Sequence, residues 1–196
     1  MKKEISRRKF MKTTALAGSA AAVMPKNLFS YRKKNKVKLG FIGTGLRGQW
    51  MLWLATKYPE LEISAICDID DGMIESALKI IKDSGRPDPR IYKQHEEDFL
   101  NMVNNENLDG VYIATPWEWH HPMAIAAMEA GIHVGTEVPA ALTVRECWDL
   151  VNVSEKTRKF CMIMENVCYR RDVMAVLNMV RQDLFGELLH CQGGYQ

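Results

Sequence analysis

The sequence contains no hydrophobic run long enough to span a membrane. Its longest weakly apolar stretch, residues 13–24, has about 12 residues, whereas a spanning helix needs roughly 20. It also contains no CxxC pair, and its cysteines are odd in number: Cys67, Cys147, Cys161, Cys168 and Cys191. A stable membrane anchor is therefore not expected, and the cysteine pattern indicates neither a paired-cysteine motif nor an even set of disulfides.

Basic residues are scarce in the body of the chain. Residues 1–38 hold 12 Lys and Arg against one acid, Glu4, whereas the remainder holds 14 basic and 23 acidic residues. A body with this negative charge repels phosphate backbones, so nucleic-acid binding by the folded part is not expected. The length of 196 residues leaves room for one ordinary domain, or one domain and a short appendage.

The N-terminal segment has the layout of an export signal. Residues 6–10 read SRRKF, and a short apolar stretch and a polar exit follow them. The paired arginines resemble the twin-arginine signal, which implies that export machinery as a partner and the periplasm or cell envelope as the location. We expect a signal peptide and linker start at 1–30 and a basic linker at 31–36. Folding in the reducing cytoplasm before export would leave the thiols free. The alternative is a basic, disordered tail.

From residue 37 onward, short apolar strands alternate with amphipathic helices. The expected strands are 37–42, 61–67, 91–92, 109–114, 132–135 and 160–164, and the expected helices are 46–57, 71–83, 96–104, 121–130, 143–158 and 171–183. Repeated strand–helix units predict an α/β fold with a doubly wound parallel sheet of the Rossmann type. This domain would cover 37–185, and 186–196 would form the first strand of a second, α+β domain.

Three glycines and an aspartate point to a dinucleotide. Gly43, Gly45 and Gly48 form a GxGxxG spacing that would allow a tight turn, a close pyrophosphate and close helix packing, respectively. Asp68 ends the second strand 20 positions later, where it can accept hydrogen bonds from ribose hydroxyls and would repel a 2′-phosphate. The pattern favours NAD over NADP, although Arg47 could contact a phosphate. A plain glycine turn with a solvated acid, or an S-adenosylmethionine enzyme, stays an alternative.

Two polar stretches follow the fourth and fifth expected strands, at the carboxyl ends where ligands bind in open α/β sheets. They read TPWEWH at 115–120 and TEVPAA at 136–141. Trp117 and Trp119 would offer flat surfaces near a nicotinamide. His120 and His121 are adjacent, so their side chains point apart, and no third ligand is evident; a metal site is therefore not expected.

The order GxGxxG, Asp68, TPxxxH and Glu-x-Pro resembles the Gfo/Idh/MocA oxidoreductase family. From Glu137 onward the chain is more similar still to glycoside hydrolase family 109, the NAD-dependent α-N-acetylgalactosaminidases. The residues that carry this likeness are TEVPAALTVRECWDLV (136–151) and MENVCYRRDVMAVLNMVRQDLFGELLHCQGGYQ (164–196). The resemblance covers nearly all of 37–196 and implies NAD as cofactor and a glycan as substrate.

The resemblance also implies which residues contact these ligands. Tyr195 would meet the sugar. NAD would be contacted by Gly43, Gly45, Leu46, Arg47, Gly48, Asp68, Trp117, Glu118, Trp119, His120, Glu137, Val138 and Asn166. Simpler interpretations stay open, because Leu46 and Val138 could merely pack. Asn166 could cap the next helix, and Tyr195 could be an ordinary sheet residue.

The chemistry that the resemblance implies is a redox-neutral cycle. NAD would take a hydride from C3 of the sugar, and the resulting ketone would acidify the C2 proton. A base would remove that proton, the C1 oxygen would leave, water would add, and the hydride would return. Val138 stands where the wider dehydrogenase family commonly has a catalytic lysine, and valine cannot move a proton. The paired carboxylates of ordinary glycosidases are not expected, so Glu118 and Glu137 are not given those roles.

Family members continue into an antiparallel sheet that supplies sugar contacts and a catalytic histidine. The resemblance therefore implies that the catalytic residues lie beyond residue 196, and that these 196 residues bind NAD without turnover. Two alternatives are an NAD-dependent sugar or polyol dehydrogenase of the same family, and a non-catalytic, nucleotide-binding envelope protein. A homo-oligomer is a further open alternative.

Overall fold

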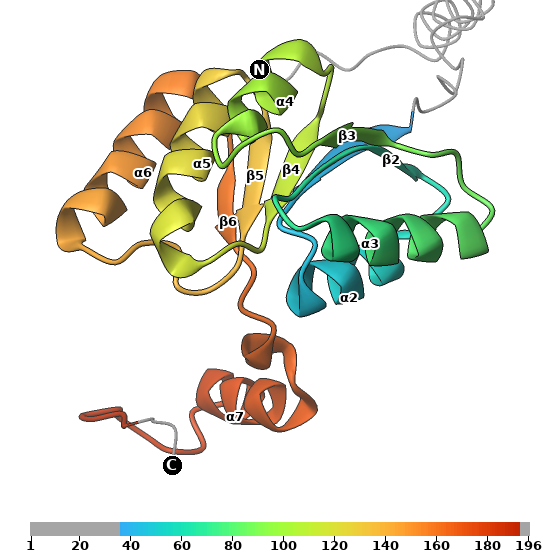
Figure 1. The fold of residues 1–196 in the computed structure, drawn as a ribbon. Helices are drawn as coiled ribbons and strands as arrows, with labels where there is room; N and C mark the ends of the chain where they lie inside the picture. Colours follow the sequence, from blue (N-terminus) through green and yellow to red (C-terminus); the bar gives the residue numbers. More distant parts are fainter. Residues whose placement is uncertain (1–35, 193–196) are drawn as a thin grey trace, which may run out of the picture. The chain divides into compact units, whose positions relative to one another are not determined.

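The computed structural model describes residues 36–192, so the expected signal segment, most of the linker and Tyr195 lie outside the described residues. Six strands form one parallel sheet in the order β3-β2-β1-β4-β5-β6 (Figure 1). They are β1 (Val37–Ile42), β2 (Leu61–Cys67), β3 (Arg90–Tyr92), β4 (Gly110–Ile113), β5 (His133–Thr136) and β6 (Cys161–Ile163). The predicted doubly wound parallel sheet is confirmed.

Helices cover the two faces of this sheet unequally. Helices α2 (Leu46–Ala55) and α3 (Asp71–Asp83) cover one face beside β1 and β2, whereas α4 (Asp98–Asn105), α5 (Trp117–Glu129) and α6 (Val144–Thr157) cover the other (Figure 1). Successive residues of a strand point to opposite faces, so Phe41 joins the core under α2 and α3, and Ile42 joins the core under α4 and α5. The sheet thus separates two apolar cores.

The chain reverses its direction of winding between β1 and β4, which are neighbours in the sheet. β1 leads through α2 to β2 on one side, and β4 leads through α5 to β5 on the other side. The loops that leave β1 and β4 therefore diverge, and they open a crevice at the carboxyl ends of the strands. Gly43 donates its amide to Cys67 O at 2.8 Å, which anchors one wall of this crevice to β2.

Most elements lie within two residues of their predicted bounds, but α5 begins four residues earlier than the sequence indicates. Pro116 is the N-cap, and the helix starts directly after it at Trp117. Pro122 lies inside α5 and has no amide hydrogen to donate to the carbonyl of Glu118. The helix therefore forms across both prolines, and the prediction of a start at residue 121 is wrong.

The C-terminal part of the described chain consists of the short 3-10 helix η2 (Val167–Tyr169) and α7 (Arg171–Arg181). Residues 186–192 form no strand here, so the strand expected from residue 186 stays a prediction. All five cysteines are free. In the part of the chain that the structure describes, no helix has both the length and the hydropathy needed to cross a membrane.

Candidate functional site

The glycine turn between β1 and α2 is shaped by close backbone contacts. Gly43 has a φ of +85°, and a side chain there would place Cβ 2.5 Å from the carbonyl oxygen of Ala114. At Gly48 a Cβ would lie 2.0 Å from the carbonyl oxygen of Gly43. These two glycines are therefore required by the packing of the turn against β4 and against its own helix.

Gly45 differs from its two neighbours. It is the N-cap of α2, its φ of −63° suits any residue, and a Cβ there would meet no atom within 4 Å. The protein alone thus has no need of glycine at this position, and the space beside it is open. The first amides of α2 and the positive end of its dipole border the same space, which suits an anion such as a pyrophosphate.

Asp68 directly follows β2 and turns its carboxylate toward the glycine turn. Its Oδ2 accepts hydrogen bonds from the backbone amide of Thr44 at 2.5 Å and from Thr44 Oγ1 at 2.9 Å, and its Oδ1 accepts one from the amide of Asp70 at 3.0 Å. A carboxylate has about four acceptor positions, so one is left for a ribose hydroxyl. These bonds fix the carboxylate at the edge of the crevice.

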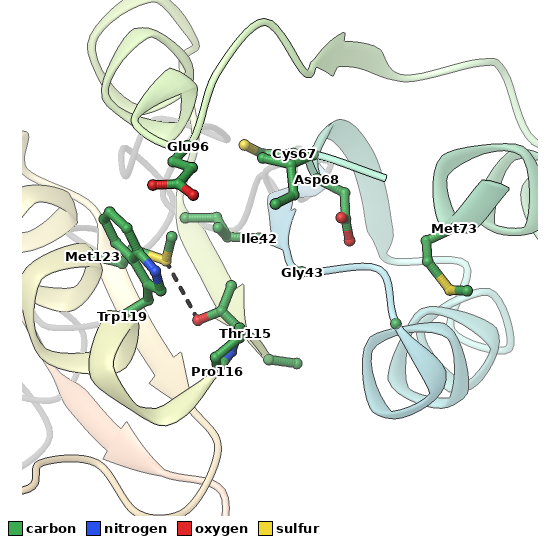
Figure 2. A pocket seen from close by; sticks show the side chains of 13 residues that line it. Ile42, Gly43, Cys67, Asp68, Met73, Glu96, Thr115, Pro116, Trp119 and Met123 are labelled. Carbon is green, nitrogen blue, oxygen red and sulfur yellow. Dashed lines mark hydrogen bonds between the residues drawn. The ribbon is translucent and has the colours of Figure 1, made fainter. Parts of the chain in front are cut away.

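A pocket of about 280 Å³ fills the crevice between these groups. Figure 2 shows Asp68 and Met73 on one side of it and Trp119 and Met123 on the other. The lining residues are Ile42, Gly43, Gly45, Cys67, Asp68, Ile69, Met73, Glu96, Ala114, Thr115, Pro116, Trp119 and Met123. Small-molecule sites begin at about 300 Å³, so this pocket suits one half of a dinucleotide. Its apolar walls, the open space at Gly45 and the Asp68 acceptor fit the adenosine half of NAD.

Arg47 points from the glycine turn to the end of β5. Its Nε donates to Glu137 Oε1 at 2.6 Å, and its Nη2 makes a long hydrogen bond of 3.5 Å to Asn166 Oδ1. The hydrogen bond to Glu137 raises the pKa of Arg47 despite partial burial. The hydroxyl of Tyr112, whose pKa is raised by burial and by Glu137, donates to the same carboxylate oxygen. The structure therefore brings together three residues that are far apart in the sequence, Arg47, Glu137 and Asn166. All three are expected to contact NAD.

The residues of the TPWEWH stretch (115–120) have different places at the site: some line the pocket, two are exposed, and one joins the neighbouring loops. Trp119 lines the pocket and packs edge-on against Phe99, with ring centroids 6.1 Å apart. Trp117 and Glu118 are exposed on the first turn of α5. His120 is 1% exposed, and its Nδ1 and Nε2 lie 2.7 Å from Pro139 O and 2.9 Å from Thr115 O. His120 thus joins the loops after β4 and β5, and its expected contact with NAD stays a prediction.

Leu46 and Val138 face solvent at two ends of the site. Leu46 is 87% exposed at the start of α2, and Val138 is 41% exposed after β5. Neither side chain packs in the core, which removes the simplest alternative to their expected contact with NAD. That contact stays a prediction, as does the substrate role of Tyr195, which lies outside the described residues.

Sequence reasoning missed several residues that shape the site. Thr44 is fully buried and donates a hydrogen bond to the carboxylate of Asp68. Tyr112, in β4, donates a hydrogen bond to the carboxylate of Glu137. Tyr112 looked like a core residue of a buried strand, so the sequence carried no signal for its hydroxyl. Thr44 lies inside the GxGxxG loop at a position that the motif leaves open.

The thiol of Cys67 is not placed to act as a nucleophile. Cys67 lines the pocket, but burial and the nearby acids Asp98 and Asp68 raise its pKa to about 12, so its nucleophilic thiolate does not form near neutral pH. Within residues 36–192, no three His, Cys, Asp or Glu side chains are placed to hold a metal ion.

Two family models match adjacent parts of the chain. Residues 37–165 match the oxidoreductase family with an NAD-binding Rossmann fold, GFO/IDH/MocA. Residues 169–196 match the C-terminal domain of glycosyl hydrolase 109. Helix α7 falls within the second match, whereas the sequence places the domain boundary at residue 185.

Individual relatives agree with both matches. The chain is 49% identical to a glycosyl hydrolase family 109 protein of Parabacteroides distasonis, over 98% of this chain and 45% of the relative. It is 47% identical to the alpha-N-acetylgalactosaminidase of Tannerella forsythia over the same shares. The chain therefore spans about 45% of the length of these curated relatives.

Solved structures give the same fold. An NAD-binding protein from Listeria innocua has a TM-score of 0.63 and 30% identity, over 78% of this chain and 42% of that one. The glycine turn, the strand-end acid and the crevice at the reversal of winding agree with the first family model, which extends over most of the described residues. The chain belongs to the Gfo/Idh/MocA oxidoreductase family, whose shared element is an NAD-binding Rossmann domain.

Proposed function

We propose that this chain is the NAD-binding part of a glycosidase that removes terminal α-linked N-acetylgalactosamine. The observation that carries the proposal is the crevice in which Gly45 leaves room beside Asp68, on a chain that is 47% identical to an alpha-N-acetylgalactosaminidase. When bound, NAD supplies a hydride acceptor and donor, so that the sugar can be oxidised before cleavage and reduced after it. The cofactor would not be consumed.

The residues of this chain would hold NAD at three places. Asp68 would accept from the adenosine ribose, and the amides that begin α2 after Gly45 would bind the pyrophosphate. The group formed by Arg47, Glu137 and Asn166 lies at the end of β5, on the side of the turn away from Asp68. Because Glu137 holds Arg47 there, Arg47 is not free to bind a 2′-phosphate beside Asp68, which favours NAD.

Glu137 and Val138 do not suit the mechanism of a conventional glycosidase or that of a lysine-dependent dehydrogenase. Glu137 is 7% exposed and is paired with Arg47 at 2.6 Å, so it is not placed as a free acid or base of a conventional glycosidase. Val138 has no proton to donate, which disfavours the dehydrogenase that would need a lysine there. The base for the C2 proton would come from the part of the relatives that this chain does not span.

The test uses a protein of the relatives' length that contains this chain. We expect release of p-nitrophenol from p-nitrophenyl α-N-acetylgalactosaminide to require NAD, and NADH absorbance to stay flat during turnover. In deuterated water the released sugar should carry deuterium at C2, because the C2 proton exchanges in the cycle. Steady growth of NADH absorbance with a free sugar would instead establish a dehydrogenase, and NAD binding with neither reaction would establish a non-catalytic protein.

The location and the sugar contact are also part of the proposal. The paired Arg7 and Arg8 support twin-arginine export to the periplasm, and Tyr195 supports a substrate contact by its place in the glycosidase-like segment. Replacement of both arginines by lysine should retain a tagged protein in the cytoplasmic fraction. The change Tyr195→Phe should raise KM for the glycoside while leaving the affinity for NAD unchanged.

A further inference from the structure

Tyr112 is buried in β4, but its hydroxyl belongs to the candidate site. The residue is 6% exposed and packs against Phe41 of β1, with ring centroids 5.7 Å apart. Phenylalanine would fill this place in the core equally well, and a buried hydroxyl costs free energy unless it makes a hydrogen bond. The hydroxyl of Tyr112 makes that bond to the carboxylate of Glu137. Packing therefore accounts for the ring of Tyr112 but not for its hydroxyl.

The absence of a side chain at Gly135 of β5 lets the ring of Tyr112 reach Glu137. Tyr112 pairs in register with Gly135, and a Cβ at Gly135 would lie 3.9 Å from Cδ2 of Tyr112. Alternate residues of a strand point to the same face, so Glu137, two residues after Gly135, continues the face that carries the ring. The hydroxyl can thus reach the carboxylate although Tyr112 lies in β4 and Glu137 follows β5.

Glu137 is held by two donors on one of its two oxygens. Arg47 Nε donates to Oε1 at 2.6 Å, and the Tyr112 hydroxyl donates to the same atom. Burial above all raises the pKa of Tyr112, so the phenol keeps its proton and stays a donor. Within residues 36–192, Oε2 of Glu137 makes no hydrogen bond, and His121 Nε2 is the only fully buried side-chain nitrogen or oxygen without a partner. Oε2 is therefore open to solvent and available as an acceptor.

This open oxygen lies across the sheet from Asp68. Asp68 follows β2 and Glu137 follows β5, and the strand order β2-β1-β4-β5 separates them by three strand spacings. At about 4.8 Å each, these spacings place the two strand ends roughly 14 Å apart. Asp68 and the first amides of α2 provide for the adenosine and the pyrophosphate of NAD. Glu137 is therefore placed for the part of NAD beyond the pyrophosphate, whose ribose carries two hydroxyl donors.

We propose that Tyr112 is a positioning residue for the nicotinamide half of NAD. Together with Arg47 it holds Oε1 of Glu137, and this fixes the carboxylate so that Oε2 can accept from a hydroxyl of the nicotinamide ribose. Tyr112 acts through Glu137 and needs no contact with the cofactor. The inference rests on the proposed binding of NAD along this crevice, and it adds a residue that the sequence motifs leave out.

The test compares two tyrosines that have the same chemistry in different places. Tyr92 donates its hydroxyl to Glu106 Oε1 at 2.6 Å, and that oxygen also accepts from Arg90 at 3.1 Å, but these residues do not line the pocket. By calorimetry on the 196-residue chain, we expect Tyr112→Phe to raise the Kd for NAD about tenfold, as the loss of a hydrogen bond to a charged group does. Tyr92→Phe should leave this Kd unchanged. Urea unfolding checks that both variants are folded.

A fragment of the cofactor separates positioning from general damage to the fold. ADP contains the adenosine and the pyrophosphate but lacks the nicotinamide ribose, so Tyr112→Phe should change its Kd by less than about twofold. In a Glu137→Ala background, Tyr112→Phe should change the Kd for NAD by less than about twofold as well, because the hydroxyl then has no carboxylate to hold.

An unchanged Kd for NAD in Tyr112→Phe would overturn the inference while leaving the binding of NAD intact. Equal losses for NAD and ADP would overturn it too, because Tyr112 would then act on the fold as a whole. So would an undiminished loss in the Glu137→Ala background, because Tyr112 would then act without Glu137. Failure of the unmodified chain to bind NAD would contradict the proposed function itself, and the inference with it. None of these affinities depends on glycoside cleavage.

Discussion

Gly45 and Gly48 belong to the same turn, but different neighbours require them. The Cβ of Gly45→Ala would enter open space, whereas the Cβ of Gly48→Ala would lie 2.0 Å from the carbonyl oxygen of Gly43. For Gly45→Ala we expect the free energy of unfolding to change by less than about 1 kcal/mol, since reduced freedom of the unfolded chain offsets a poorer N-cap. The affinity for NAD should fall at least tenfold, because the methyl group occupies the place of the pyrophosphate.

Gly48→Ala is the matched substitution, and we expect it to reduce the stability of the fold, which Gly45→Ala should leave nearly unchanged. It should lower the free energy of unfolding by more than about 1 kcal/mol, as overpacking does. Urea unfolding and NAD titration by calorimetry measure the two quantities on the same samples. Full NAD affinity in Gly45→Ala would show that no ligand approaches this backbone.

Asp98 is a buried acid whose hydrogen bonds make stability depend on pH. Burial alone would raise its pKa, but the amide of Gln94 at 2.9 Å and the side chain of Asn101 at 2.7 Å hold the pKa below the ordinary value of 3.8. The folded state therefore gains stability above pH 3.8, and this gain is lost as the pH falls through the depressed pKa. Asp98→Asn should flatten the dependence of the free energy of unfolding on pH in that acid range. The exposed Asp88→Asn should leave the curve unchanged, and an unchanged curve in Asp98→Asn would contradict the assignment.

At the scale of elements, Arg86 joins the end of α2 to the start of β2. Its guanidinium donates to the carbonyls of Thr56 at 3.1 Å and of Tyr58 at 2.6 Å, and also to that of Leu61. These carbonyls include the negative end of the α2 dipole, and a guanidinium can serve several acceptors at once. Arg86→Ala should lower the free energy of unfolding by about 1.5–3 kcal/mol.

The control for Arg86 lies four residues further along. Arg90 is also an arginine, but its side chain is 72% exposed and pairs with Glu106 at the surface. Arg90→Ala should therefore lower the free energy of unfolding much less than Arg86→Ala does. Arg86→Lys keeps the charge but loses the planar guanidinium that donates to several carbonyls at once, so its free energy of unfolding should fall about as far as that of Arg86→Ala. Thermal and urea unfolding check all three, and equal losses at positions 86 and 90 would refute the role of Arg86.

The elements differ in how well the sequence predicts them, for physical reasons. Strands β1 and β2 are predicted to within a residue, because their apolar runs end at Gly43 and Asp68. These two residues also belong to the site. The start of α5 was predicted wrongly, because the sequence does not show that Pro116 is the N-cap of a helix that begins at the next residue. The partnership of Arg47 with Glu137, 90 positions apart, likewise depends on the order of strands in the sheet.

For the molecule as a whole, a bound nucleotide must stabilise the folded state, because only the fold brings β1, β2 and β4 around one crevice. NAD at 100 times its dissociation constant should add about 2.7 kcal/mol to the free energy of unfolding. NADP at the same concentration should add much less, since Asp68 repels its 2′-phosphate and Glu137 holds Arg47 away. Asp68→Asn keeps an acceptor for Thr44 but removes the charge, so it should weaken the NAD effect and narrow the gap between the cofactors. Thermal unfolding with each nucleotide measures this. If NADP stabilises the unmodified chain as well as NAD does, the Asp68 carboxylate does not border the bound ribose.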